Sequence, residues 1–417
     1  MKWNKLGRGT LASILSLALV SVTACSRDYV LAYVYVTTAK PLTSSSPAGG
    51  VSAYAVDYQI GSLTPLADSP VTAGRNPVTL VASPNGLNLY VVNHDDSSVS
   101  DFAIGTDGKI FLQNTYNVTG SQATAIAIDA AGAFLYVTFT YQVGPNGQQL
   151  YSPASPGPGG VTIFPINAKD GSLGTPSTVK VGNNPVGIVV SRPAGGNTYA
   201  YVLDQETPTT PKAQVLGFAQ NTTTGALTPV PGTSITTDST GKTVAVGYGA
   251  GTTPSAIAED PSSRFVYITD EATNQLYGNV VANNGSLVAM TNGPFATGIF
   301  PVGLTIDPRG KFLYVANLSS STVSAYAIDV ASGTPVGSVG SASTATDTSP
   351  TCVTIEPALG IYLYTSNNLA NTVSAMQLDP HNGGLKQVQN SPFPSGALPT
   401  CAVSVANGSH PTQIIVP

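Results

Sequence analysis

Short apolar runs recur along the chain, and each is bounded by Gly, Pro, Asn or Asp. Residues 77–82 read Pro-Val-Thr-Leu-Val-Ala, and residues 88–93 read Asn-Leu-Tyr-Val-Val-Asn. Runs of roughly four to eight residues that are rich in β-branched and aromatic side chains, with turn residues at both ends, are typical of β-strands. The pattern therefore predicts an all-β protein made of many short strands.

One repeated unit contains most of these runs. A Pro opens an apolar run, an Asp-Pro-x-Gly type of turn follows, and Leu-Tyr-Val-x-Asn and Val-Ser-x-Tyr-x-Ile runs come next, as in residues 301–328 and 77–104. Each unit predicts four short strands, which we name A to D in chain order. Seven copies are marked by a tyrosine in strand B: Tyr35, Tyr90, Tyr136, Tyr201, Tyr267, Tyr314 and Tyr364. The sequence therefore predicts a seven-bladed β-propeller of four-stranded antiparallel blades.

The order of the strands also predicts how the ring closes. The chain enters the repeat at a strand B, residues 33–37, so the strand A of that blade must come from the C-terminal end. Residues 399–405 and residues 411–416 both carry the strand A pattern, and we favour 399–405. A large β-sandwich is the rival all-β fold, but it does not require such regular copies.

The first 24 residues predict a targeting segment. Lys2, Lys5 and Arg8 precede an apolar stretch, residues 11–22, that is too short to span a bilayer. The Val-Thr-Ala-Cys sequence that ends at Cys25 resembles the lipobox of bacterial lipoproteins. This resemblance implies cleavage before Cys25 and acylation of its thiol, while an ordinary signal peptide with a chance Cys is the alternative.

The domain prediction follows from these two features. It has a signal peptide over 1–24, a lipidated Cys25 with a short tether over 25–30, and the propeller over 31–417. Ser26, by the same resemblance, implies the outer membrane of the cell envelope, on its periplasmic or its surface side. We expect a monomer that the lipid attaches to the membrane.

Composition excludes several other classes of protein. Only 9% of residues are charged and 42% are hydrophobic, with 43 Gly and 32 Pro, which excludes a disordered chain and a coiled coil. Without residues 1–24 the chain has 13 Lys and Arg against 21 Asp and Glu, a net charge of −8. A protein that binds nucleic acid has the opposite sign of charge, so we expect no nucleic-acid partner.

The strand motifs resemble a known family. The Tyr-Val-x-Asn runs and the Gly-Ala-Leu-Thr-Pro-Val sequence at residues 225–230 are similar to those of the lactonase-like seven-bladed propellers, also described as YVTN repeat proteins. The resemblance covers essentially the whole chain after the signal peptide. Because that family includes 6-phosphogluconolactonases and muconate-cyclising enzymes, it implies a lactone ring as a substrate.

Strand direction divides the connections between two sides of the ring. The A–B and C–D turns share one side, here called the turn side, and the B–C and D–A loops share the other, the loop side. The long insertions all belong to the loop side: residues 39–50, 142–160, 205–213, 232–253 and 340–349. Loops displayed by a rigid scaffold commonly carry binding sites, although drift in unconstrained loops is the alternative.

Polar residues after the B strands predict a site around the loop-side mouth of the central channel. His94 beside Asp95 could act as a general base, so these two are the candidate catalytic residues. The candidate ligand-binding residues are Arg75, Asp96, Asp204, Glu206, Asp270, Glu271, Asn317 and Asn367. The expected ligand is a carbohydrate, another small molecule or a protein, and the carboxylates could hold Ca²⁺. Solvated loop polarity is the alternative, and no zinc site or other metal motif is present.

The charges of the loop side bear on the substrate. We count four cations against nine carboxylates there, among them Asp68. A phosphorylated sugar lactone needs convergent Arg or Lys side chains around its phosphate. The count therefore disfavours 6-phosphogluconolactonase activity, whatever the family resemblance implies.

Three further residues depart from their surroundings. Glu259 stands in an otherwise apolar column of strand A, so we expect it to be paired or to have a raised pKa. Cys352 and Cys401 occupy the same position of consecutive A strands, and an oxidising compartment would favour a disulfide between them. The spacing of about 10 Å between packed sheets opposes that bond. The sequence leaves it open.

Two functions remain open at this stage. The first is a non-catalytic, lipid-anchored propeller that presents a binding face. The second is a lactone hydrolase or isomerase acting on an uncharged or cationic ring, with His94 and a neighbouring carboxylate in the acid and base roles. The fold alone does not decide between them, because propellers serve many activities.

Overall fold

A computed structural model describes residues 29–144, 146–152, 157–192, 196–205, 213–237, 243–338, 343–408 and 410. The predicted signal peptide over 1–24, Cys25, Glu206 and the alternative closing strand over 411–416 lie outside the described residues. Every regular element in the described part is a β-strand. None of its segments forms a helix long and apolar enough to cross a membrane.

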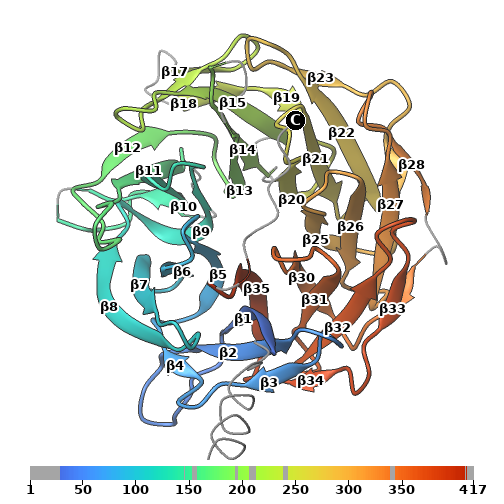
Figure 1. Cartoon of the computed structure of the whole chain (residues 1–417). Helices are drawn as coiled ribbons and strands as arrows, with labels where there is room; N and C mark the ends of the chain where they lie inside the picture. The colour runs from blue at the N-terminus through green and yellow to red at the C-terminus, as the bar shows by residue number, and fades with distance from the viewer. Residues whose placement is uncertain are drawn as a thin grey trace, which may run out of the picture.

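Seven antiparallel sheets surround a central axis, as Figure 1 shows, and each holds strands A to D from the axis outward. Blade 1 contains β35 (Pro399–Ala406), β1 (Val30–Thr38), β2 (Gly50–Asp57) and β3 (Leu63–Pro65). Blade 2 contains β5 (Pro77–Ala82), β6 (Asn88–Asn93), β7 (Ser98–Ile104) and β8 (Ile110–Asn117). Blade 3 contains β9 (Gly120–Ile128), β10 (Phe134–Gln142), β11 (Gly160–Pro165) and β12 (Ser177–Lys180).

The other four blades repeat this order. Blade 4 contains β13 (Pro185–Val190), β14 (Tyr199–Asp204), β15 (Gln214–Gln220) and β16 (Leu227–Pro229). Blade 5 contains β20 (Pro254–Glu259), β21 (Phe265–Asp270), β22 (Gln275–Val281) and β23 (Leu287–Ala289). Blade 6 contains β25 (Pro301–Ile306), β26 (Phe312–Asn317), β27 (Thr322–Ile328) and β28 (Pro335–Ser338). Blade 7 contains β30 (Pro350–Ile355), β31 (Tyr362–Asn367), β32 (Thr372–Leu378) and β33 (Leu385–Gln387). The predicted seven-bladed propeller is confirmed.

The D–A loops add short strands that the repeat pattern did not predict. Five of them pair with the strand C of their own blade: β4 (Val71–Thr72), β19 (Tyr248–Gly249), β24 (Phe295–Ala296), β29 (Thr344–Ala345) and β34 (Phe393–Pro394). The insertion over 232–253 also holds a hairpin of β17 (Ser234–Thr237) and β18 (Thr243–Val246). Of these strands, β17, β18, β19 and β29 lie within the insertions predicted over 232–253 and 340–349, whereas β4, β24 and β34 lie outside the predicted insertions.

The two ends of the described chain close the ring in blade 1. Strand β1 lies between β2 and β35 and pairs antiparallel with both, so that Tyr35 faces Ala53 on one side and Val403 on the other. The prediction that residues 399–405 complete blade 1 is confirmed. Because this closure is made by hydrogen bonds between strands, β1 has a partner strand on both of its edges.

Every blade donates one tyrosine hydroxyl to the next. The B-strand tyrosines that mark the repeat are all fully buried, and each OH donates a hydrogen bond of 2.6–3.0 Å to the carbonyl of a glycine in the neighbouring C–D turn. The accepting glycines are Gly108, Gly171, Gly225, Gly285, Gly333, Gly383 and, across the closure, Gly61. We call this contact the blade latch.

The latch requires glycine for two reasons, which Gly383 illustrates. Its φ is +74°, a backbone conformation that other residues rarely adopt. A Cβ built on it would also lie 2.3 Å from the ring of Phe312, which comes two residues before the donor Tyr314. The glycine, the ring and the tyrosine therefore form one interlocked contact between blades 6 and 7.

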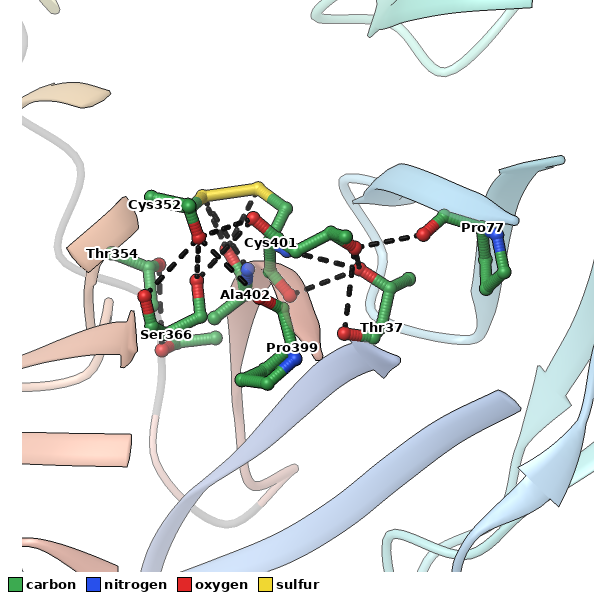
Figure 2. Close-up of a disulfide and its surroundings, with 11 residues drawn as sticks. Thr37, Pro77, Cys352, Thr354, Ser366, Pro399, Cys401 and Ala402 are labelled. Carbon is green, nitrogen blue, oxygen red and sulfur yellow. Dashed lines mark hydrogen bonds between the residues drawn. A yellow bond between two sulfur atoms is a disulfide. The ribbon is translucent and has the colours of Figure 1, made fainter. Parts of the chain in front are cut away.

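A disulfide ties blade 7 to the closing strand. Cys352 of β30 and Cys401 of β35 are bonded, as Figure 2 shows, and their Cα atoms lie 4.8 Å apart. The expected spacing of about 10 Å does not apply there, because the innermost strands lie closer together than the faces of packed sheets. The N–H of Ala402 also donates to Cys352 Sγ at 3.4 Å. The bond fixes β35 beside β30, where β1 can pair with it.

The latch predicts a measurable loss of stability in Tyr314→Phe. The variant leaves the carbonyl of Gly383 without its buried donor and should lower the free energy of unfolding by about 1–3 kcal/mol. Denaturant unfolding measures the loss. Tyr29→Phe is the matched control, because Tyr29 is 60% exposed. Equal unfolding midpoints for both variants would contradict the role of the latch.

The disulfide predicts sensitivity to reductant. It closes a loop with a sequence separation of 49, for which chain entropy alone gives about 4 kcal/mol of stabilisation. The free energy of unfolding, measured with denaturant, should be lower by about that amount when a phosphine reductant is present. The double variant Cys352→Ala/Cys401→Ala should unfold at the same midpoint in both conditions. A wild-type midpoint that does not respond to the reductant would disprove the bond's contribution.

Candidate functional site

Four of the predicted site residues converge on the loop side of blade 2. Arg75 belongs to the D–A loop before β5, and His94, Asp95 and Asp96 belong to the B–C turn after β6. The two segments are joined by backbone as well, because the N–H of His94 donates to the carbonyl of Asn76 at 3.0 Å. We call Arg75, His94, Asp95 and Asp96 the blade 2 cluster.

His94 and Asp95 form a directed pair. His94 Nδ1 lies 2.7 Å from Asp95 Oδ1, and Asn76 Nδ2 donates to the same oxygen at 3.1 Å. These hydrogen bonds, His94 first, lower the pKa of Asp95 below its ordinary value. An ionised Asp95 accepts the Nδ1 proton of a neutral imidazole, which leaves Nε2 as an acceptor that can take a proton from water.

Arg75 is already paired inside the cluster. Its Nε donates to Asp96 Oδ1 at 2.5 Å, its backbone N–H donates to Asp96 Oδ2 at 2.6 Å, and one terminal nitrogen donates to the carbonyl of Asp95 at 3.1 Å. The Arg75 side chain is 49% exposed and that of His94 28% exposed, so the cluster faces solvent. The charge of Asp96 offsets that of the guanidinium, which weakens its attraction for a phosphate.

The other predicted residues at the ends of B strands have their side chains inside the blades. Asp204, Asp270, Asn317 and Asn367 are at most 2% exposed. Asn317 shows their arrangement: its Oδ1 accepts from the N–H of Gly298, and its Nδ2 donates to Ser324 Oγ and Thr322 Oγ1. These side chains hold the loops in place, and ligand binding by them stays a prediction.

The carboxylates of this set bind backbone N–H groups in the same way. Asp270 accepts from the N–H groups of Thr252 and Thr253 in the loop before β20. Asp204 accepts from the N–H of Asn184, and burial raises the pKa of Asp204. Glu271 follows Asp270, and burial likewise raises its pKa. Within the described part of the chain, no group of three or more His, Cys, Asp or Glu is arranged to hold a metal ion.

The central channel contains a cavity of about 250 Å³. The innermost strands line it with small and apolar side chains, such as Ala125, Val186 and Ile257, and with the Cys352–Cys401 disulfide. None of the lining residues is charged, so the cavity cannot by itself hold a phosphate.

Asp68, which the sequence assigned to the loop side, instead lies 3.3 Å from Lys109 of the β7–β8 turn. Asp68 is therefore paired with a cation from the turn side, and it does not belong among the carboxylates counted on the loop side.

Glu259 and Asp101 are two further carboxylates with raised pKa values, of which Glu259 is half-buried and Asp101 fully buried. Glu259 Oε1 has no hydrogen-bond partner in the described structure, and burial, with a contribution from Asp260, raises its pKa well above the ordinary value. The predicted raised pKa of Glu259 is confirmed. Asp101 of β7, which the sequence analysis missed, is 1% exposed, and burial raises its pKa to about 6.

Comparison with known proteins bears on this architecture. A family model described as lactonase, 7-bladed beta-propeller, matches residues 33–179 and 196–355. A periplasmic gluconolactonase of Pseudomonas aeruginosa is 22% identical, with a TM-score of 0.65 over 90% of this chain and 99% of that one. A candidate 6-phosphogluconolactonase of Bacteroides fragilis is 21% identical, with a TM-score of 0.67 over 91% and 99%. None of the curated proteins compared with the chain matches it.

The raised pKa of Asp101 predicts a pH-dependent difference between wild type and Asp101→Asn. The folded protein holds the Asp101 proton more tightly than the unfolded chain, whose pKa is about 3.9. Wild type therefore loses stability relative to the variant as pH rises from about 4 through 6, and the difference is constant above that. Melting temperatures between pH 4 and 8 measure it. A difference that does not change with pH would show that Asp101 titrates normally.

Proposed function

Since this chain belongs to the lactonase family of seven-bladed β-propellers, we propose that it hydrolyses an uncharged lactone ring at the blade 2 cluster. One observation carries the proposal: the 2.7 Å contact between His94 and Asp95 orients an imidazole whose second nitrogen is open, and the Arg75 guanidinium donates to the carbonyl of the same Asp95. A fixed base next to a cation is the arrangement that ester hydrolysis requires.

The chemistry can be assigned to named atoms. His94 Nε2 takes a proton from a water molecule as the water oxygen attacks the lactone carbonyl carbon. The carbonyl electrons move to its oxygen, where the Arg75 guanidinium stabilises the negative charge. When the carbonyl re-forms, the ring C–O bond breaks and the leaving oxygen takes the proton from His94, which gives an open hydroxy acid.

The charges favour a neutral substrate. Arg75 is held by Asp96, and no second Arg or Lys accompanies it in the blade 2 cluster. A phosphorylated lactone would meet Asp95 and Asp96 without a free cation to bind its phosphate. The proposed substrate is therefore a lactone without a phosphate group.

A non-catalytic binding propeller is the second candidate, and the exposure of the cluster favours it. Asp95 is 49% exposed, and lactonases of this kind would need some exclusion of water around the reacting ring.

For either function we propose the location that the N-terminal sequence predicts, a lipid anchor at Cys25 in the cell envelope. Metabolic labelling with a fatty acid and its loss in Cys25→Ala would test the anchor.

Assay of the purified protein on a lactone panel tests the proposal. The panel includes glucono-1,5-lactone and its 6-phosphate. We expect turnover of the neutral lactone, and His94→Ala should lower kcat/KM by about 100-fold or more, because general bases commonly contribute at least that much. His381→Ala is the matched control, since His381 is exposed in the β32–β33 turn on the opposite side.

Two results would contradict the proposal. Turnover that survives His94→Ala would remove the cluster from the mechanism. No turnover on any lactone, in a protein that melts cooperatively, would favour the binding propeller instead.

A further inference from the structure

One position of strand B is aromatic in six blades and polar in the seventh. Two residues before each latch tyrosine, a buried ring packs on the C–D turn glycine of the next blade: Tyr33, Phe134, Tyr199, Phe265, Phe312 and Tyr362. Blade 2 has Asn88 there, packed on Gly171 of blade 3. An amide is shorter than an aromatic ring, so the contact between blades 2 and 3 is less filled than the others.

Blade 2 also differs from the other six blades at one position of strand C. The residue of strand C that pairs with the latch tyrosine is Ala53, Ile163, Gly217, Gly278, Ala325 or Ala375 in the other six blades. In blade 2 it is Asp101, which pairs with Tyr90. Asn88 Nδ2 donates to Asp101 Oδ1 at 3.3 Å and to the carbonyl of Asp170 at 3.2 Å. The two departures therefore form one polar pair.

A cavity of about 670 Å³ opens beside Asn88 on the turn side. Its walls come from the A–B turns of blades 2 and 3 and from the C–D turn of blade 3. Asn88, Ser83 and Asn85 contribute polar atoms, while Ile104 and Ile166 contribute apolar surface. The volume lies within the range of small-molecule sites in proteins.

We propose that this cavity between blades 2 and 3 binds an uncharged, polyhydroxylated ligand such as a sugar ring. The site lies on the opposite side of the propeller from the blade 2 cluster and does not depend on the proposed lactonase activity. Asn88 and Asp101 are the residues that distinguish it from the six equivalent contacts between blades.

The hydrogen-bonding groups of the wall match hydroxyls. Asn85 Oδ1 accepts from Ser83 Oγ and from the N–H of Leu87, and its Nδ2 donates to no described residue. Asn88 Nδ2 is used by Asp101 and Asp170, and its Oδ1 accepts from no described residue. One free donor and one free acceptor suit a pair of hydroxyls, each of which can serve both roles.

The charges at the rim favour a neutral ligand. Lys169 and Asp170 both belong to the C–D turn of blade 3 that lines the cavity, and their charges cancel. Asp101 lies behind Asn88 at 1% exposure, so it fixes the amide and does not face the cavity directly. The charged residues of the cavity wall therefore carry no net charge, which is consistent with a neutral ligand.

Ligand-observed NMR on the full chain tests the proposal, with D-glucose and cellobiose as probes. We expect saturation transfer to at least one of them. The double variant Asn88→Phe/Asp101→Ala restores what the other blades carry, so it should fold with an equal or higher melting temperature and bind about tenfold more weakly or not at all. His94→Ala, on the other side, should keep the binding.

The outcomes separate this site from the loop-side site. Failure of both sugars to bind wild type at tens of millimolar concentration would overturn the proposal, as would equal binding to wild type and the double variant. Loss of binding in His94→Ala would assign the sugar to the blade 2 cluster instead. The lactone assay of the double variant should match wild type, because the two sites are independent.

Discussion

Seven buried tyrosine hydroxyls hold the blades of this propeller together, and the rest of the structure depends on them. Each donates to a glycine carbonyl that would otherwise be a buried acceptor without a partner between two sheets. The bond sets how far neighbouring blades stand apart at the turn side. Because Tyr364 donates to Gly61 across the closure, the same contact also joins the last blade to the first. A sheet-to-sheet interface made only of apolar contacts would not fix its register in this way.

Most of the fold could be predicted because it repeats. The seven tyrosines, the Pro that opens strand A in six of the seven blades and the turn glycines predict the number of blades, their strand order and the closing strand. The disulfide could not be settled, since its geometry depends on how closely β30 and β35 approach near the axis. The orientation of the side chains at the B-strand ends could not be predicted either, because a position at a strand end does not reveal whether the side chain faces the channel or turns back to bind loop N–H groups, as those of Asn317 and Asp270 do.

Some differences between the blades have a purely structural reason, and the paired hydroxyls of strands A and B are an example. Blades 1, 3, 5 and 7 carry hydroxyl pairs 2.7–3.1 Å apart, namely Thr400–Thr37, Thr124–Thr138, Ser255–Thr269 and Thr351–Ser366. The equivalent positions of blades 2, 4 and 6 are apolar: Val78–Val92, Val186–Leu203 and Val302–Ala316. Both members of each pair change together, so that every hydroxyl keeps a hydroxyl partner in the neighbouring strand. The hydroxyl of strand A also donates to a carbonyl of the next blade, as Thr124 does to Pro185.

A comparison of equivalent positions in the seven blades also separates packing from function at Asn88 and Asp101. These two also change together and share a hydrogen bond, but the pair is incomplete, because the amide of Asn88 keeps an acceptor open toward a cavity. The six other blades of the same chain carry an aromatic ring and a small or apolar residue at these two positions. The blades of a repeat protein can therefore be compared with one another, and a departure that leaves a hydrogen-bonding group open toward a cavity points to a ligand that completes the network.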